Sequence, residues 1–403
     1  MSGGGEPGIL QGEGGPRVPA ESLTWVEVNE AALEHNARSL KARVGEKCVF
    51  APVVKANGYG HGLVNAAQAF VRGGADWLCV HELEEALILR EAGVAIPLYV
   101  VGYVPPSDAA LVVSSQVRIV LYDLGMVQAL NEAGKQANAV VPVHIKLETG
   151  NHRQGVEEDE AWGLVEAISE AQFVSLEGLS THFADVEDTT NHAYAQSQLE
   201  RFSGFHERCK EAGILIPMLH TANSAATLLW KHAHGDMVRA GIAAYGLWPS
   251  NETLITALQG TEETLILRGA LTWKARVAQV KDVPSGAYVG YGRTYRTTHP
   301  SRIAVLTVGY YDGYDRKLSN QAFVLIDGHR APVRGRVCMN MVMVDVTHVP
   351  RVQVGDEVVL LGRSGEESIT PEMMADWAGT IHYEVISRIH ERIPRISVRG
   401  DFD

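Results

Sequence analysis

An alternation of short apolar runs with helix-like segments, from residue 22 to about residue 247, limits the fold more than any other feature of this chain. Segments such as "VNAAQAFVRGG" and "LEEALILREAG" repeat apolar residues at three- and four-residue intervals, as amphipathic helices do. Eight strand–helix repeats in a stretch of this length favour a closed (β/α)8 TIM-type barrel over an open sheet. The predicted strands are "APVVKA" (51–56), "DWLCVH" (76–81), "IPLYVVG" (96–102), "VRIVLYD" (117–123), "VPVHIKLET" (141–149), "FVSLEGLSTHF" (173–183), "MLHTAN" (218–223) and "DMVRAG" (236–241).

The chain changes character after residue 263. The segments "LRGALTWKARVAQVKDV", "RIAVLTVGYYDG" and "GDEVVLLGR" are rich in strand-forming residues and are linked by Gly, Pro and Asp-Gly turns. One helix follows, with Thr370 as its N-cap and Pro371 at its first position. We therefore expect an α/β protein in three parts: a flexible Gly/Pro-rich tail at 1–21, a barrel at 22–262 and a mostly β C-terminal domain at 263–403.

Composition excludes several classes of protein. The net charge of −13 argues against a nucleic-acid-binding protein, which needs a basic surface. No apolar run is long enough to span a bilayer, and the N-terminal tail lacks the apolar core of a signal peptide. The cysteines are scattered, with no spacing typical of metal ligands. These features predict a cytoplasmic protein that binds neither a membrane nor a structural metal.

Polar residues stand at the end of several predicted strands, or in the loop that follows. In a (β/α)8 barrel the active site lies at the C-terminal ends of the strands, so side chains at these exits share one mouth. Packing alone does not explain so many polar residues at these positions. In strand order they are Lys55, Arg153, His182, His220, Asn223, Ser224 and Arg239.

Lys55 ends the first predicted strand and precedes the turn-rich segment "ANGYGHG". A lysine in a partly desolvated cavity has a lowered pKa and becomes nucleophilic, which suits a Schiff base with an aldehyde. If the aldehyde is pyridoxal phosphate, the site also needs a phosphate cradle and a partner for the pyridine nitrogen. Ser224 and the backbone amides near Gly241 and Ile242 suit the phosphate, and Arg239 suits the ring nitrogen.

Taken singly, these features have simpler explanations. A lysine at a strand end commonly extends to solvent, His182 could be a hydrogen-bonded barrel residue, and Arg239 could be half of an ion pair. The G-x-G spacing of "NGYGHG" is weak evidence for a phosphate loop. Their joint occurrence at the exits of one barrel favours a functional site.

Seven separated motifs occur in order along the chain: "VVKANGYGHG", "THFAD", "HTANSAA", "DMVRAGIAAYGLWPS", "VGYGRTYRT", "VGYYDGYDR" and "GRVCMNMVMVD". Through them the chain resembles alanine racemase, a family of fold-type III pyridoxal-phosphate enzymes, from Leu23 to Ile396. The resemblance implies an isomerase that interconverts L- and D-alanine and supplies D-alanine for bacterial peptidoglycan. It also implies a homodimer whose sites are composite.

Racemisation removes a proton from one face of the substrate and returns one to the other, so it needs two bases. The resemblance gives these roles to Lys55, which also binds the cofactor, and to Tyr291, which a hydrogen-bonded chain through His182 and Arg239 makes basic. Tyr291 and Met339 would reach the site from the partner subunit. The cofactor-binding positions match Lys55, Tyr59, His182, Asn223, Ser224, Arg239, Gly241, Ile242 and Tyr383.

Four further positions follow from the same resemblance. Arg153 and Met339 match residues that hold the substrate carboxylate, and Tyr310 matches one that narrows the entrance. Lys146 matches a lysine that is carbamylated in many members, and a negative carbamate there would brace Arg153. In "TGNHRQG", Asn151 and His152 replace the Met and Gly of many members, and "CMNM" has Asn340 in place of an aspartate. These departures leave the breadth of substrates open.

Three rival functions remain. A broad-specificity amino-acid racemase would share this scaffold, although such proteins usually have an export signal. A fold-type III decarboxylase would have a Gly-rich phosphate segment that this chain lacks. A non-catalytic pyridoxal-phosphate carrier would be a single barrel, whereas about a third of this chain is a second, β-rich part.

Overall fold

The computed structural model describes residues 22–260 and 264–400, so the predicted tail at 1–21 lies outside the described residues. The described chain divides into two compact units. The first contains residues 30–271 and 370–391, and we call it the barrel unit. The second contains residues 22–29, 272–369 and 392–400, and we call it the sheet unit.

The barrel unit is a ring of eight parallel strands, and seven of them overlap strands predicted from the sequence. The first differs: the strand predicted at 51–56 is β2 at Val49–Phe50, and within 51–56 only Val53 forms a bridge before α2 begins at Lys55. Strands β3 to β8 form a continuous parallel sheet in sequence order. The ring closes because β2 pairs with β9, a bridge joins Val53 to Cys79 beside β3, and the N–H of Asp236 donates to Leu219 O of β8. The strands are β2 (Val49–Phe50), β3 (Leu78–Val80), β4 (Leu98–Val100), β5 (Arg118–Leu121), β6 (Val141–Lys146), β7 (Val174–Ser180), β8 (Met218–His220) and β9 (Met237–Val238). The predicted TIM-type barrel is confirmed.

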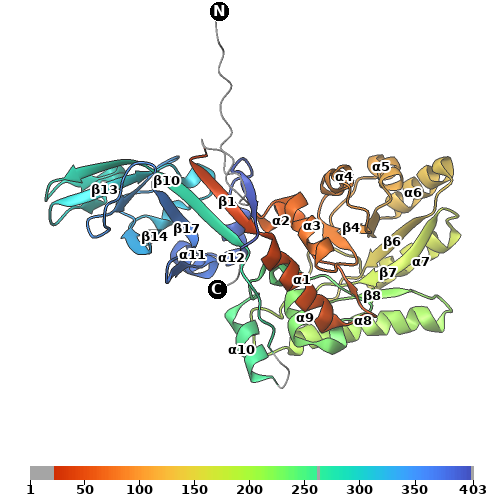
Figure 1. The fold of residues 1–403 in the computed structure, drawn as a ribbon. Helices are drawn as coiled ribbons and strands as arrows, with labels where there is room; N and C mark the ends of the chain where they lie inside the picture. Colours follow the sequence, from red (N-terminus) through yellow and green to blue (C-terminus); the bar gives the residue numbers. More distant parts are fainter. Residues whose placement is uncertain (1–21, 261–263, 401–403) are drawn as a thin grey trace, which may run out of the picture. The chain divides into compact units, whose positions relative to one another are not determined.

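Amphipathic helices cover the outside of the strands, and Figure 1 shows α4, α5, α6 and α7 in this position. In α3, for example, Leu63, Ala66, Ala67 and Phe70 form the buried stripe expected at helical spacing. The helices of this unit are α1 (Glu30–Val44), α2 (Lys55–Tyr59), α3 (Leu63–Arg72), α4 (Leu83–Glu91), α5 (Ala109–Ser115), α6 (Leu124–Ala137), α7 (Glu158–Glu170), α8 (Ala193–Glu211), α9 (Ser224–Leu229), α10 (Asn251–Gln259), α11 (Pro371–Ala378) and α12 (His382–Ser387).

The sheet unit is built around the long strand β10 (Leu271–Val283), which pairs with β13 and β17. Burial alternates along the first half of β10, where the side chains of Trp273, Ala275 and Val277 are buried and those between them are half-buried. The predicted β-rich C-terminal region is thus confirmed. Its other strands are β1 (Thr24–Asn29), β11 (Tyr288–Val289), β12 (Tyr295–Arg296), β13 (Ser301–Leu306), β14 (Phe323–Ile326), β15 (His329–Pro332), β16 (Val342–Asp345), β17 (Glu357–Ser364), β18 (Glu367–Ile369) and β19 (Arg395–Val398).

Two segments belong to a different unit from the one that their place in the chain suggests. Strand β1 pairs in parallel with β19, so the residues before the barrel join the sheet unit. Helices α11 and α12 come after most of the sheet unit but belong to the barrel unit, where α12 contacts α2. Thr370 caps α11 as predicted, because its hydroxyl accepts the N–H of Met373 at 3.2 Å.

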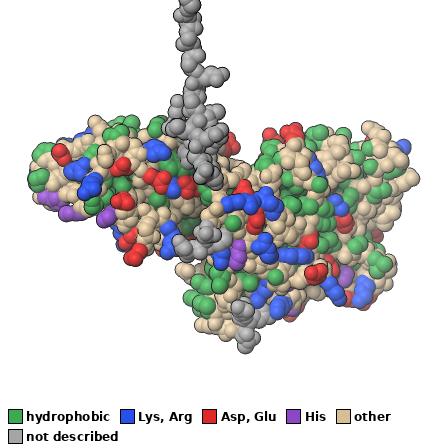
Figure 2. Space-filling view, in the orientation of Figure 1, with side chains coloured by type: hydrophobic (Ala, Val, Ile, Leu, Met, Phe, Trp, Pro, Cys, Tyr) green, Lys and Arg blue, Asp and Glu red, His purple; other side chains and the backbone are tan. Residues whose placement is uncertain are grey.

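Acidic and basic side chains are interspersed on the face of the barrel unit shown in Figure 2. Within residues 22–260 and 264–400, no helix combines the length and the apolar character needed to cross a bilayer.

Candidate active site

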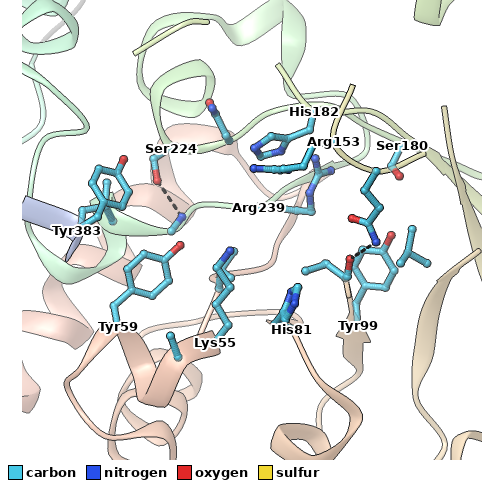
Figure 3. A pocket seen from close by; sticks show the side chains of 18 of the residues that line it. Lys55, Tyr59, His81, Tyr99, Arg153, Ser180, His182, Ser224, Arg239 and Tyr383 are labelled. Atoms are coloured by element: carbon cyan, nitrogen blue, oxygen red, sulfur yellow. Dashed lines mark hydrogen bonds between the residues drawn. The ribbon is translucent and has the colours of Figure 1, made fainter. Parts of the chain in front are cut away.

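A cavity of about 490 Å³ lies among the C-terminal ends of the barrel strands, and all of its lining residues belong to the barrel unit. In Figure 3, Lys55 extends into it from below, with Tyr59 and His81 on either side, and Arg239, His182 and Arg153 lie opposite. The structure thus brings together residues that are distant in sequence. The predicted site residues that line the cavity are Lys55, Tyr59, Lys146, Arg153, His182, Asn223, Ser224, Arg239, Gly241, Ile242 and Tyr383.

The backbone becomes left-handed directly after Lys55. Ala56, Asn57 and Gly58 have φ angles of 54°, 54° and 61°. Outside glycine this conformation costs roughly 1 kcal/mol per residue. Asparagine tolerates it best, and the side chain of Asn57 also accepts the N–H of Leu63 at 2.9 Å. The turn redirects the chain at once, so that Lys55 remains at the strand exit.

Two contacts anchor this turn to the barrel unit. The carboxylate of Glu85 accepts the N–H of Ala56 through one oxygen and that of His81 through the other, each at 2.8 Å. Gly60 has a φ of 84° and lies against the carbonyl of Ile386, where a Cβ would come within 2.0 Å of the oxygen. The glycines after Lys55 are therefore required by the path of the chain, and α12 forms one wall of the turn.

Burial lowers the pKa of Lys55, and the positive charge of Arg153 lowers it further, although Glu85 opposes the shift. A lowered pKa increases the fraction of neutral, nucleophilic amine at neutral pH. This is the electrostatic setting that the sequence predicted for Lys55.

Ser224 and Gly241 form a small polar cradle at one end of the cavity. The hydroxyl of Ser224 accepts the N–H of Gly241 at 2.8 Å and that of Ala243 at 3.3 Å. A Cβ on Gly241 would lie 2.5 Å from the hydroxyl of Tyr59, so only glycine leaves this space open. The Tyr59 and Tyr383 rings lie 6.4 Å apart beside it. Hydroxyl groups and backbone amides of this kind suit a bound phosphate.

Arg239 is buried, and residues of the barrel interior hold its guanidinium. One of its terminal nitrogens hydrogen-bonds Nδ1 of His220, and the other donates to Thr181 O at 2.7 Å. His182 lies in the same cavity, where burial and the charge of Arg239 lower the pKa of its imidazole well below the usual range. The environment therefore favours a neutral His182 beside a fixed cation.

Lys146 lines the cavity on the side of Arg153. Its ammonium nitrogen donates to Gln154 Oε1 at 3.0 Å, and Gln154 in turn donates to Val101 O at 3.0 Å. Burial, followed by the charges of Arg239 and Arg153, lowers the pKa of Lys146 to about 7. A neutral amine is thus readily available at physiological pH.

His152, one of the departures from the family pattern, has a φ of 49°. Glycine adopts a positive φ more easily than other residues, which explains why many family members have glycine at this position. In this chain the histidine adopts that conformation instead. The neighbouring Asn151 donates to the carbonyl of His182 at 3.4 Å. The altered loop is therefore tied to the site.

Tyr291, Tyr310 and Met339 do not line this cavity. They belong to the sheet unit, and their exposed fractions are 72%, 42% and 55%. The predicted second catalytic base, the entrance residue and one of the substrate-binding residues thus lie on the surface of a single chain.

Six polar residues that line the cavity were not among the predicted site residues: His81, Tyr99, Gln154, Ser180, Glu187 and Ser387. His81 directly follows β3 and Ser180 ends β7, so the strand-exit rule that selected Lys55 would also have found them. Tyr99 lies within a fully buried strand, where apolar alternation does not indicate which side chain points inward.

Comparison with known proteins agrees with this structure. A family model described as "Alanine racemase, N-terminal domain" matches residues 28–249, and one described as "Alanine racemase, C-terminal domain" matches residues 270–397. The alanine racemase of Desulfovibrio desulfuricans is 42% identical over 381 residues, which cover 94% of this chain and 100% of that protein. That of Symbiobacterium thermophilum is 43% identical over 372 residues, or 92% of this chain and 96% of that protein.

Solved structures give the same relationship. Alanine racemase from Bacillus anthracis with bound L-Ala-P has a TM-score of 0.88 and 35% identity, covering 95% of this chain and 97% of that one. The Bartonella henselae alanine racemase with covalently bound pyridoxal phosphate has a TM-score of 0.80 and 26% identity, covering 94% and 100%. The fold and these matches define a two-part enzyme of the racemase class. The chain belongs to the alanine racemase family.

Proposed function

We propose that this protein interconverts L- and D-alanine with pyridoxal 5'-phosphate bound in the barrel cavity. The observation on which this rests is the convergence of a desolvated lysine, a phosphate-type cradle and a buried arginine on one cavity, in a chain of the alanine racemase family. The reaction class is isomerisation, EC 5.1.1.1.

The residues of the cavity fit the cofactor. Lys55 would bind its aldehyde, Arg239 would face the ring nitrogen, and the phosphate would lie against the cradle of Ser224, Gly241 and Ile242, with Tyr59 and Tyr383 nearby. Pyridoxal phosphate, when bound, provides an electron-withdrawing ring that acidifies the α-hydrogen of an attached amino acid. His182 and Asn223 complete the cofactor-binding set.

The amine of Lys55 would take or return the α-proton on one face of the substrate, and the phenol oxygen of Tyr291 would do so on the other. Because Tyr291 is exposed and absent from the lining of the cavity, we place it in the site of a second copy of the chain, together with Met339. The active enzyme is then a homodimer with two composite sites. Tyr310, from the same unit, would narrow the entrance.

Arg153 would hold the substrate carboxylate, with Met339 as the partner's contribution. We propose that Lys146 is carbamylated, because its pKa of about 7 leaves much of the amine neutral and reactive toward CO2. The neutral amine forms an N–C bond to CO2 and releases one proton to water, so the lysine can no longer be a cation near Arg153 and becomes an anion that braces the guanidinium. The supply of D-alanine for peptidoglycan in the bacterial cytoplasm is the role we infer from the family.

A chiral assay of the purified protein with added pyridoxal phosphate tests this proposal. Racemisation of alanine far above that of other amino acids is expected. Comparable turnover of many amino acids would favour a broad-specificity racemase, and CO2 release would favour a decarboxylase. Cofactor binding without conversion of any amino acid would leave only a carrier and would contradict the proposal.

A further inference from the structure

A chain of hydrogen-bonded side chains runs from Arg239 through the barrel interior to Glu177. Arg239 contacts Nδ1 of His220, Nε2 of His220 lies 2.7 Å from Nδ1 of His144, and Nε2 of His144 lies 3.0 Å from a carboxylate oxygen of Glu177. Both imidazoles are fully buried. We call this set of four residues the Arg239–Glu177 chain. Only Arg239 belongs to the lining of the cavity.

The two ends of the chain determine which way every hydrogen bond points. A guanidinium can only donate, and an ionised carboxylate can only accept. His220 must therefore accept at Nδ1 and donate from Nε2, and His144 must do the same. Each ring has a single proton, on Nε2, because a second proton would place two N–H groups face to face. Burial agrees with this, since it lowers the pKa of both imidazoles.

Two local features of β7 make the contact between His144 and Glu177 possible. Pairing of β6 with β7 shifts register between Val143 and His144, which leaves Glu177 as the extra residue of a β-bulge. The next residue is Gly178, where a Cβ would lie 2.3 Å from Nδ1 of His144. A bulge redirects the side chain, and the glycine leaves room for the imidazole ring.

Arg118 keeps the far end of the chain ionised. Its guanidinium meets both carboxylate oxygens of Glu177, at 3.1 and 3.3 Å, and it stacks over the Trp77 ring at 4.7 Å. Burial raises the pKa of Glu177, but the hydrogen bonds from His144 and Arg118 outweigh this and hold it below the ordinary value. The charged and titratable groups that face the Arg239–Glu177 chain are Arg118 at the Glu177 end, Tyr99 beside both imidazoles, and Cys79, Lys146, Arg153 and His182 near Arg239.

We propose that Glu177 is a positioning residue for Arg239: it fixes the tautomers of His144 and His220, so that Arg239 always meets an acceptor and stays oriented as a cation toward the cavity. This inference rests on the proposed function only in assigning the cofactor ring to Arg239. If Glu177 becomes glutamine, the amide can donate to His144, both rings can reverse, and His220 then presents an N–H to the guanidinium.

Nitrogen-15 NMR of histidine-labelled holoenzyme tests the tautomers directly and does not depend on activity. Assignment by His144→Gln and His220→Gln variants should show both rings neutral with the proton on Nε2 in the wild-type protein. A proton on Nδ1 of either ring, or a protonated ring at neutral pH, would overturn the proposal even if the protein racemises alanine.

The variants Glu177→Gln and Gly178→Ala disrupt the Arg239–Glu177 chain in independent ways. The first removes the carboxylate charge, and the second displaces the imidazole of His144. Each should perturb the tautomer signals, shift the absorbance of the bound cofactor and lower kcat about tenfold to a hundredfold, the range seen for partners one step removed from a functional group. The alanine KM should change much less. Glu158→Gln, at an exposed ion pair with Arg208, is the matched control and should change none of these. Unaltered tautomers and absorbance in folded Glu177→Gln would refute the proposal.

Discussion

The predicted site residues of the barrel unit and those of the sheet unit have opposite environments. Lys55, Lys146 and Arg239 are enclosed in one cavity, where burial lowers the pKa of each. Tyr291 and Met339 are mostly exposed, and they do not line that cavity. One group has its chemistry tuned by the fold of a single chain. The other is exposed in the described chain, and for this reason we assign it to the partner's site.

The largest expected effect is the loss of Lys55. Lys55→Ala should lower kcat by roughly 10⁴-fold or more, the scale found when a covalent residue is removed, and should abolish the visible absorbance of bound cofactor. Lys210→Ala, at an exposed ion pair with Glu207, is the control lysine. Absorbance that survives borohydride treatment and dialysis of Lys55→Ala would show that another residue binds the cofactor.

A complementation experiment tests whether the exposed group serves a second chain. Lys55→Ala and Tyr291→Ala proteins, each inactive, are mixed, unfolded and refolded together. In a mixed dimer one site receives both defects and the other neither, so random pairing should restore about a quarter of wild-type sites. If mixed dimers form but show no activity, each chain builds its own site. The exposure of Tyr291 would then not mean that it serves a second chain.

Tyr291→Phe sharpens the same contrast, because we propose that Lys55 and Tyr291 serve opposite faces of the substrate. The variant should lose solvent exchange of the α-proton of L-alanine far more than that of D-alanine, in line with the family's assignment of the tyrosine to the L-isomer. Deuterium incorporation measured by NMR distinguishes the isomers. Equal losses for both would argue against this sidedness.

Ser224→Ala should weaken cofactor binding about tenfold to a hundredfold, as expected for one hydrogen bond to a charged group. The variant also leaves the N–H groups of Gly241 and Ala243 without the hydroxyl that orients them. Fluorescence titration with pyridoxal phosphate gives the dissociation constant. Ser114→Ala, whose exposed hydroxyl only contacts Leu111 O, should bind normally. An unchanged dissociation constant in Ser224→Ala would place the phosphate elsewhere.

The smallest expected effect concerns Lys146. Its pKa is lowered to about 7, so the neutral amine predominates above that pH, and carbamate should increase as pH rises through 7 at constant CO2 pressure. A carbonyl signal from ¹³CO2 should follow this curve and disappear in Lys146→Met, with a few-fold rise in the alanine KM. A bare amine at pH 8 under CO2, seen in crystallographic density, would contradict the assignment.

The sequence predicted the barrel well because eight apolar runs and their helices are strong local signals. Such local signals do not indicate which distant segments of the chain pair or pack together. Strand β1 lies within the range 22–262 predicted for the barrel, yet it pairs with β19, some 370 positions away along the chain. Helices α11 and α12 could not be assigned to the barrel unit for the same reason.

The site residues likewise divide into those that a local pattern indicates and those that only the folded chain brings together. Lys55 and Ser224 were found because strand exits are visible in a sequence. His144 and Glu177 were not, because a β-bulge and a missing Cβ at Gly178 bring them together, and neither has a pattern that a single sequence displays.

The closure of the barrel has a consequence for how the protein folds. The strands that close it, β2 and β9, come from opposite ends of the barrel sequence, and Tyr245 Oη joins Val53 O across 192 positions. Contacts of such long sequence separation form late and slowly, since the entropy of closing the loop is lost before they are made. Lys55 and Arg239 follow these two strands. A nascent chain therefore cannot assemble the cavity until Arg239, at position 239 of 403, has left the ribosome, and Tyr383 of α12 completes its lining only near the end of synthesis.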